Sequence, residues 1–156
     1  MGDRARERRG REVEALRVEM APLPGALDLL VAVKERGDRL VLSSALQQRH
    51  VEVFLDMLDA RGIIDDRTTS ADGEASKPAP DLLQAALKKL GGPPQASRVM
   101  VGDSVWDVEA AKRARMVAIV VRSGGFGDHE LQKAGAVALY DPPGDLAKAL
   151  DDTPLA

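Results

Sequence analysis

Two aspartates near the middle of the chain have the spacing of a divalent-cation site. In the segment VMVGDSVWD (99–107), Asp103 directly follows an apolar run, and Asp107 comes four residues later in the first turn of a predicted helix. Both carboxylates can therefore face one point. Such a pair suits Mg²⁺, which takes oxygen ligands and bridges to substrate phosphate. A structural interpretation stays open, in which Asp103 and Ser104 cap the helix and Asp107 complements its dipole.

Two serines and one lysine have residue types that favour an anion. Ser43 and Ser44 follow the apolar run at 40–42, and Lys77 lies in the turn KPAPD, before a helix that starts at Pro80. A hydroxyl, nearby backbone N–H groups and an ammonium at the ends of strands can hold a phosphate. Taken singly, the serines are also ordinary turn and cap residues, and the lysine is an ordinary solvated one.

A parallel sheet would bring these residues together. Short, continuous apolar runs at 39–42, 98–101, 117–121 and 137–140 predict buried strands, and a weak strand or turn follows Asp65-Asp66. Helices are predicted between Pro22 and Gly37 and near 47–61, 80–90, 106–115, 130–134 and 146–150. Each parallel connection crosses over through a helix, so we expect a three-layer, Rossmann-like α/β domain. Ligands of such sheets bind beyond the carboxyl ends of the strands.

The composition excludes several classes of protein. A chain of 156 residues, 44% hydrophobic and 30% charged, is one globular domain. It has no Cys and two His, which excludes a disulfide scaffold and a thiolate metal site and argues against a His-rich one. A net charge of −3 gives no reason to expect nucleic acid, and the longest apolar run, Met116 to Val121, is too short to cross a membrane. We therefore expect a cytoplasmic protein.

The first 19 residues differ from the rest in composition. They carry six arginines, with glutamates interleaved at helical spacings such as Glu7 to Arg11. This pattern predicts a solvated helix, lacks the apolar stretch that a secretion signal needs, and has acidic residues that argue against a transit peptide. An arginine-rich arm that folds on RNA is the alternative.

In combination, these segments resemble motifs two, three and four of the haloacid dehalogenase-like (HAD) superfamily of phosphohydrolases. The order along the chain is a strand-end serine, the lysine of KPAPD and then GDSVWD. The resemblance extends from Pro22 to Leu150, includes LPG (23–25) and SGGFG (123–127), and points to the phosphoglycolate phosphatase and beta-phosphoglucomutase branch. A receiver domain uses similar residue types, but there the acidic residues come first along the chain.

The resemblance implies phosphoryl transfer through an aspartyl-phosphate, with Mg²⁺ as cofactor and a small phosphorylated metabolite as substrate. Ser43 would hydrogen-bond the phosphoryl group, with Ser44 as the alternative in register. Lys77 would neutralise charge on the nucleophile and the phosphoryl oxygens. Asp103 would bind Mg²⁺ directly, and Asp107 would bind it or orient its ligands. Transfer of another group to the same aspartate, as in dehalogenation, stays open.

The sequence departs from the family's pattern at the first motif. Residues 1–42 contain no D-x-D after an apolar run, so the nucleophile, its strand and the cap domain that follows are not found. In the family that strand is central, and its loss should leave a gap or force the serine-bearing and Asp103-bearing strands together. We expect residues 1–21 to be a residual cap-domain helix or tail and residues 22–156 to be a partial HAD-like core, from a misassigned start or a truncated gene.

Two hypotheses about function follow. The first is Mg²⁺-dependent hydrolysis of a small phosphate monoester by the complete protein, with this chain alone inactive because the nucleophile is missing. The second is a non-catalytic module that binds phosphate or Mg²⁺, or that a partner completes with a strand. A purely structural domain would give the four polar residues no reason to surround one cleft.

Overall fold

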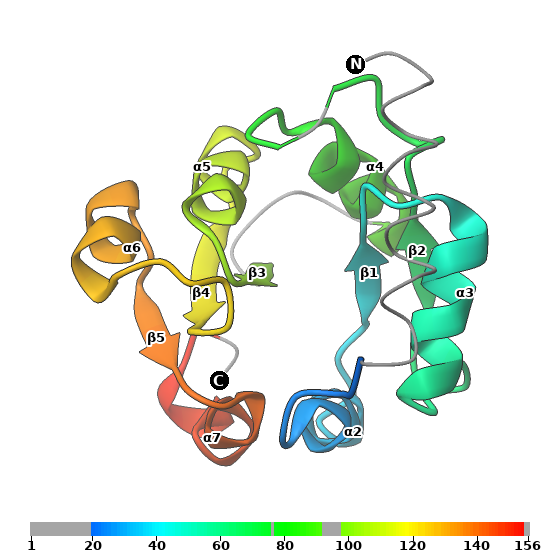
Figure 1. The fold of residues 1–156 in the computed structure, drawn as a ribbon, viewed down its shortest axis with the longest axis horizontal. Coiled ribbons are helices and arrows are strands. Elements are labelled where there is room, and N and C mark those ends of the chain that lie inside the picture. Colours follow the sequence, from blue (N-terminus) through cyan, green and yellow to red (C-terminus); the bar gives the residue numbers. More distant parts are fainter. Residues whose placement is uncertain (1–19, 76, 92–97, 155–156) are drawn as a thin grey trace.

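The computed structural model describes residues 20–154, except residue 76 and residues 92–97. Helices and strands alternate along the chain, as predicted (Figure 1). In chain order they are α2 (Ala26–Glu35), β1 (Val41–Ser43), α3 (Gln48–Met57), β2 (Asp66–Thr68), α4 (Asp81–Leu90), β3 (Val99–Gly102), α5 (Val105–Arg113), β4 (Val117–Val121), α6 (Asp128–Ala134), β5 (Ala138–Tyr140), α7 (Pro143–Lys148) and a 3₁₀ helix (Leu150–Asp152). The expected cap-domain helix or tail over residues 1–21 lies almost wholly outside the described residues.

All strand pairs in the described part of the chain are parallel, so the predicted α/β class is confirmed. β1 pairs with β2, and β4 lies between β3 and β5 in a second sheet. Helices α2 and α7 pack on one face of the second sheet, and α5 and α6 pack on the other. These are the expected three layers, seen in Figure 1 as helices on both sides of the strands. No helix in the described ranges has the length and apolar character of a membrane span.

Strand β4 explains why the apolar runs are continuous rather than alternating. Ala118 and Val120 pack into the cluster formed with α5 and α6, while Ile119 packs against α2 and α7. Ile119 and Val120 are both fully buried. A strand covered on both faces needs an apolar side chain at every position, because successive side chains point to opposite faces.

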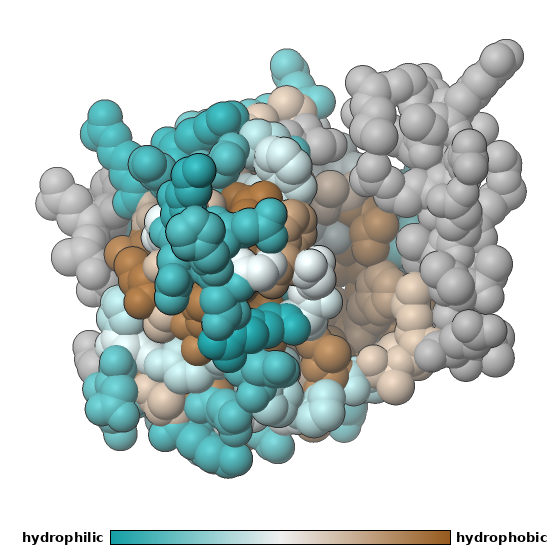
Figure 2. All heavy atoms as spheres, turned by 60° about the vertical axis from the view of Figure 1, so that its left-hand side comes forward, coloured by the Kyte–Doolittle hydropathy of each residue, from teal (hydrophilic) through white to brown (hydrophobic). Residues whose placement is uncertain are grey.

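The outer side of the second sheet is mostly hydrophilic. Figure 2 brings the side of α6 and β5 forward and shows polar side chains over much of it, with apolar ones between them. Val137, directly before β5, is 56% exposed, and Val117 at the start of β4 is 37% exposed. Single exposed apolar residues of this kind are normal on a protein surface.

The described strands form two separate sheets rather than one. Their orders are β1-β2 and β3-β4-β5, so no hydrogen-bonded strand pair joins β1 to β3. Of the two outcomes expected from a missing central strand, a gap or a forced contact, the structure has the gap.

An apolar cavity of about 300 Å³ occupies the position between the two sheets, and we call it the slot. Strands β1 and β3 line it from the sides, and helices α2 and α4 contribute leucines and other apolar residues. The lining residues are Leu29, Leu30, Val33, Arg39, Leu40, Val41, Leu42, Ser43, Ile64, Leu83, Ala86, Leu87, Leu90, Val99, Met100, Val101 and Met116. None of these is acidic.

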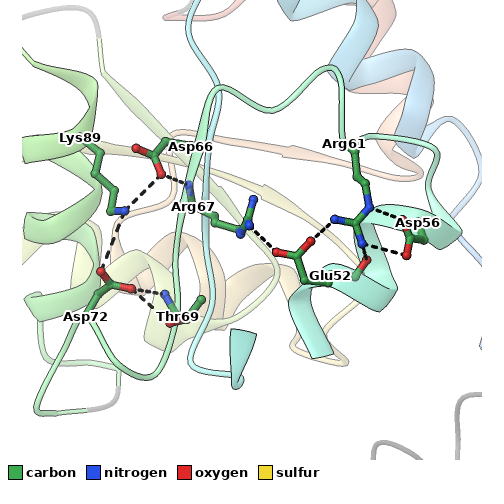
Figure 3. A network of polar contacts seen from close by, with 8 residues as sticks. All are labelled: Glu52, Asp56, Arg61, Asp66, Arg67, Thr69, Asp72 and Lys89. Atoms are coloured by element: carbon green, nitrogen blue, oxygen red, sulfur yellow. Dashed lines mark hydrogen bonds and ion pairs between the residues drawn. The ribbon is translucent and has the colours of Figure 1, made fainter. Parts of the chain in front are cut away.

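A network of charged side chains holds the two-stranded sheet from outside (Figure 3). Glu52 on α3 pairs with Arg67 of β2 and with Arg61. On the other side, Lys89 of α4 lies 3.1 Å from an oxygen of Asp66. The network therefore joins α3, β2 and α4 around the two-stranded sheet β1-β2.

Asp65 fastens helix α2 to the start of β1. Both of its carboxylate oxygens lie 2.9 Å from Nζ of Lys34, and one accepts a 2.6 Å hydrogen bond from the backbone N–H of Leu40. The hydrogen bond from Lys34 and that from Leu40 lower the pKa of Asp65 below its ordinary value of 3.8. The charged form is therefore the one that stabilises the fold.

We expect Asp65→Asn to lower the free energy of unfolding by about 1 kcal/mol at pH 7, because a charge-assisted contact is lost at a site that solvent partly screens. The contribution of a carboxylate with a depressed pKa is complete above its unfolded value and fades as pH falls below that value. The difference between wild type and variant should therefore shrink below about pH 4, in urea unfolding followed by circular dichroism. Glu35→Gln, which removes an exposed carboxylate from the same helix, is the control. An equal loss at pH 3 and pH 7 would contradict the assignment.

Candidate functional site

Asp107 is held rigidly at the first turn of α5. Ser104 is the N-cap residue, and Asp107 closes a capping box with it: the backbone N–H of Asp107 donates to Ser104 Oγ at 3.2 Å. In return, Asp107 Oδ2 accepts from Ser104 Oγ at 2.8 Å and from the backbone N–H groups of Asp103 and Ser104, both at 3.1 Å. The side chain of Asp107 is only 5% exposed. The helix-capping interpretation of this residue is thus realised.

The second carboxylate oxygen of Asp107 makes an ion pair that helix capping does not require. Asp107 Oδ1 forms an ion pair with Nζ of Lys77, which comes from the loop before α4. That loop is also fastened to α5, because Arg113 donates a hydrogen bond to the carbonyl oxygen of Pro78 at 3.1 Å. The structure therefore brings Lys77 and Asp107 into contact.

The Lys77–Asp107 ion pair fixes the relative direction of the two sheets. Lys77 belongs to the loop that follows β2, and Asp107 comes just after the carboxyl end of β3. The carboxyl ends of β2 and β3 therefore lie at the same edge, and β1 ends there too because it is parallel to β2. This is the edge at which parallel sheets bind their ligands.

Asp103 and Asp107 have opposite electrostatic environments. Burial and then the neighbouring charge of Asp107 raise the pKa of Asp103. Burial also acts to raise the pKa of Asp107, but the charge and hydrogen bond of Lys77, with bonds from Ser104 and Asp103, outweigh it and lower the pKa. Of the two carboxylates, Asp103 is thus the one whose charged form a nearby cation would stabilise most.

Two glycines allow the loops around the aspartates to approach one another. A Cβ on Gly102 would lie 2.5 Å from Cβ of Asp107, and one on Gly124 would lie 2.0 Å from the carbonyl oxygen of Asp103. Next to Gly124, Ser123 Oγ lies 3.4 Å from a carboxylate oxygen of Asp103. The segment SGGFG (123–127) therefore approaches Asp103 closely, and Gly124 is the glycine that this contact needs.

The two candidate serines have different surroundings. Ser43 ends β1 and lines the slot, and its Oγ accepts a 3.3 Å hydrogen bond from Thr68 Oγ1 at the end of β2. Ser44 Oγ instead accepts from the backbone N–H of Leu46 at 3.2 Å, as a turn residue does. Of the two hydroxyls, that of Ser43 lies beside the slot.

The donor set at this edge suits Mg²⁺ in part. Mg²⁺ is commonly held by one or two carboxylates together with waters and substrate phosphate. Asp103 has capacity for a metal, whereas both oxygens of Asp107 already accept hydrogen bonds within the protein. No group of three His, Cys, Asp or Glu side chains with metal-binding geometry occurs among the described residues. The residues therefore fit a cation held by Asp103, with Asp107 positioning the neighbouring groups.

Sequence reasoning missed two residues that support this arrangement. Thr68 is fully buried and bonds Ser43, and Arg113 holds the lysine loop through Pro78. Thr68 begins a polar stretch with no apolar run, yet a β-branched residue after Asp66-Arg67 is also compatible with the end of a strand. For Arg113 the sequence offers no signal, because its partner is a backbone carbonyl 35 residues away.

Comparisons with known proteins agree with this geometry. A family model described as a haloacid dehalogenase-like hydrolase matches residues 2–115. A phosphoglycolate phosphatase from Rhodospirillum rubrum is 36% identical over 118 residues, which cover 76% of this chain and 48% of that protein. The chain spans about half the length, or less, of the curated relatives it matches first.

Solved structures of related proteins have a similar fold. A hydrolase from Pseudomonas syringae has a TM-score of 0.88 and 30% identity, over 97% of this chain and 73% of that one. CbbY from Rhodobacter sphaeroides in complex with phosphate has a TM-score of 0.73 and 31% identity, over 85% of this chain and 60% of that one.

We expect Asp103→Asn to raise the thermal midpoint of the metal-free chain at pH 7, because it removes a carboxylate that burial and Asp107 disfavour. A carboxylate with a raised pKa weakens the fold above that pKa, and the penalty disappears as pH falls below the ordinary value of 3.8. The gain should therefore vanish near pH 3 in calorimetry. A lower midpoint for the variant at pH 7 would show that Asp103 stabilises the fold.

Proposed function

This chain belongs to the haloacid dehalogenase-like hydrolases, and on that premise we propose that it carries the phosphate- and Mg²⁺-binding part of a phosphohydrolase acting on a small phosphate monoester. The observation that carries the proposal is the Lys77–Asp107 ion pair, which places an ammonium beside Asp103 at the carboxyl edge of both sheets. The relatives named as phosphatases, and the phosphate in the CbbY structure, support the same chemistry.

Each residue has a role in this proposal that its surroundings support. Lys77 neutralises charge on the phosphoryl oxygens, and Asp107 positions the ammonium by holding Nζ. Ser43 donates a hydrogen bond to a phosphoryl oxygen while its own oxygen accepts from Thr68. Mg²⁺, held by Asp103, would supply further charge neutralisation and orient the phosphate. Ser44 keeps its place in the turn.

The proposal leaves one chemical requirement unmet within these residues. Hydrolysis through a phospho-enzyme needs a nucleophile, and no acidic side chain lines the slot between β1 and β3 in the described part of the chain. We therefore expect the nucleophile to arrive from outside the described residues, and the chain alone to be inactive. The same gap supports the second candidate function, a non-catalytic module that binds phosphate or Mg²⁺ without turnover.

Ligand binding tests the site without any turnover. Inorganic phosphate should raise the thermal midpoint of the wild type, since a ligand that binds only the folded state stabilises it. Lys77→Met should lose the phosphate shift, and Asp103→Asn should lose the shift caused by Mg²⁺. Lys133→Met, which removes an exposed ammonium from α6, should keep both shifts. Equal shifts in Lys77→Met and Lys133→Met would remove Lys77 from the site.

Turnover distinguishes the two candidate functions. With Mg²⁺ and p-nitrophenyl phosphate, we expect the chain alone to release p-nitrophenol no faster than its Asp103→Ala variant, because loss of a nucleophile costs several orders of magnitude in rate. Continuous turnover that Asp103→Ala abolishes would refute the inactivity. If the chain binds phosphate but releases p-nitrophenol only at the rate of its Asp103→Ala variant, both the hydrolase and the non-catalytic binding module are still allowed. Turnover that begins when a segment bearing a nucleophile is added would favour the hydrolase.

A further inference from the structure

The loop that carries Lys77 is fastened to α5 at two places. Within the described residues, two polar contacts join positions 77–79 to another element, and both are with α5. The Lys77 ammonium pairs with Asp107 in the first turn of the helix. The carbonyl oxygen of Pro78 accepts a hydrogen bond of 3.1 Å from Nη1 of Arg113, the last residue of the helix. The backbone next to Lys77 and the end of its side chain are therefore held separately.

The sequence of this loop explains why a donor side chain suits it. Residues 77–81 read KPAPD, and neither proline has a backbone N–H. The backbone of this segment therefore offers more carbonyl oxygens, which accept hydrogen bonds, than N–H groups, which donate them. An arginine side chain has five N–H donors and no acceptor. The guanidinium of Arg113 is therefore a matching partner for the carbonyl oxygen of Pro78.

Glu109 directs this guanidinium toward the loop. It lies one turn before Arg113 on α5, and Oε2 of Glu109 is 3.6 Å from Nη2 of Arg113. The other terminal nitrogen, Nη1, is the one that donates to Pro78. A guanidinium is a rigid planar fork, so a partner on one nitrogen restricts the direction of the other. The contact with Glu109 therefore favours the orientation in which Arg113 reaches Pro78.

The place of Arg113 on the helix separates it from the phosphate site. It comes six residues after Asp107, which is about 9 Å along the axis of an α-helix. Because α5 begins at the carboxyl edge of the sheets, Arg113 lies toward the opposite edge. Its side chain is 52% exposed, and an exposed ion pair such as that with Glu109 contributes little to the stability of a fold. These contacts therefore bear on the place of the loop more than on the stability of the fold.

We propose that Arg113 is a positioning residue of the phosphate site. By holding the carbonyl oxygen of Pro78, it fixes the backbone from which the Lys77 side chain extends to Asp107. A charged group that is held in place before the ligand arrives costs less entropy on binding, so the affinity for phosphate rises. Arg113 acts through Lys77 and does not touch the ligand. The inference rests on the proposed phosphate site, which it deepens, and the two can fail separately.

The NMR signal of the Lys77 ammonium reports its surroundings in the ligand-free chain. In a full chain with isotope-labelled lysine, the ion-paired signal that Lys77→Met removes belongs to Lys77. We expect Arg113→Met to shift or broaden this signal at a temperature where the variant is folded, because the loop is no longer held at Pro78. Lys112→Met is the matched control, since it removes a like charge from an exposed neighbour of Arg113. It should leave the Lys77 signal unchanged.

Phosphate affinity tests the consequence for binding. With inorganic phosphate at a fixed Mg²⁺ concentration, we expect Arg113→Met to raise the Kd about tenfold, in amide NMR titrations of the folded chain. Arg113→Lys keeps a donor and the charge, so its Kd should return to within about threefold of the wild-type value. Lys112→Met should stay within about twofold of it. A merely structural role of Arg113 would lower the thermal midpoint without moving the Kd of the folded chain.

Glu109→Ala distinguishes positioning from overall charge. Loss of a negative charge by itself would lower the Kd for phosphate, because like charges repel. Loss of the partner that directs Arg113 should instead raise the Kd about threefold. This variant also keeps the inference testable if Arg113→Met does not fold, because the arginine itself is unchanged.

Three outcomes would overturn the proposal. The first is an unchanged Lys77 signal in folded Arg113→Met. The second is the same Kd for phosphate in Arg113→Met and Lys112→Met, while Lys77→Met has lost phosphate binding. The third is a lower Kd in Glu109→Ala than in the wild type. If Lys77→Met binds phosphate as tightly as the wild type, the proposed phosphate site fails, whereas the Lys77 signal separately shows whether Arg113 holds the lysine.

Discussion

The ion pair between Lys77 and Asp107 is the contact on which the arrangement of the site depends. No strand pairing joins the two described sheets, so their meeting relies on side chains. Apolar contacts such as that of Leu83 on α4 with Met100 on β3 hold the two sheets together, but they do not fix the direction of one sheet relative to the other. The Asp107 side chain is only 5% exposed, and an unpaired buried charge is costly. Its carboxylate therefore needs the ammonium of Lys77 at one defined position. The ion pair therefore sets the register between the loop after β2 and the first turn of α5.

The elements that the sequence predicted well are those with a local signal. β4 appears as five consecutive apolar residues because Ile119 and Val120 are buried on opposite faces. β2 was only a weak expectation, because Asp66 and Arg67 are polar and face ion pairs with α3 and α4 rather than a core. The gap between β1 and β3 was predicted as one of two outcomes. Choosing between them required knowing how α2 and α4 pack, which no single segment encodes.

At the site, residue types were predictable and their contacts were not. GDSVWD gave both the capping box and the paired carboxylates, since these two interpretations use the same atoms of Asp107. Ser43 and Ser44 are adjacent in sequence and could not be distinguished before the bonds to Thr68 and Leu46 were seen. Burial and then the neighbouring charge of Asp107 raise the pKa of Asp103, an arrangement that costs stability. Such local conflict is common where a fold serves a ligand.

The position of β4 bears on the order in which the molecule assembles. β4 is the only described strand with a partner on each side, and β3, β4 and β5 are joined by single helices that pack directly on them. Contacts between neighbouring segments form early, because little chain entropy is lost in closing them. The part from β3 to α7 can thus act as a cooperative folding unit, against which β1, β2 and their helices consolidate later. A refolding chain would form the Lys77–Asp107 ion pair last, when Lys77 meets an α5 that is already formed.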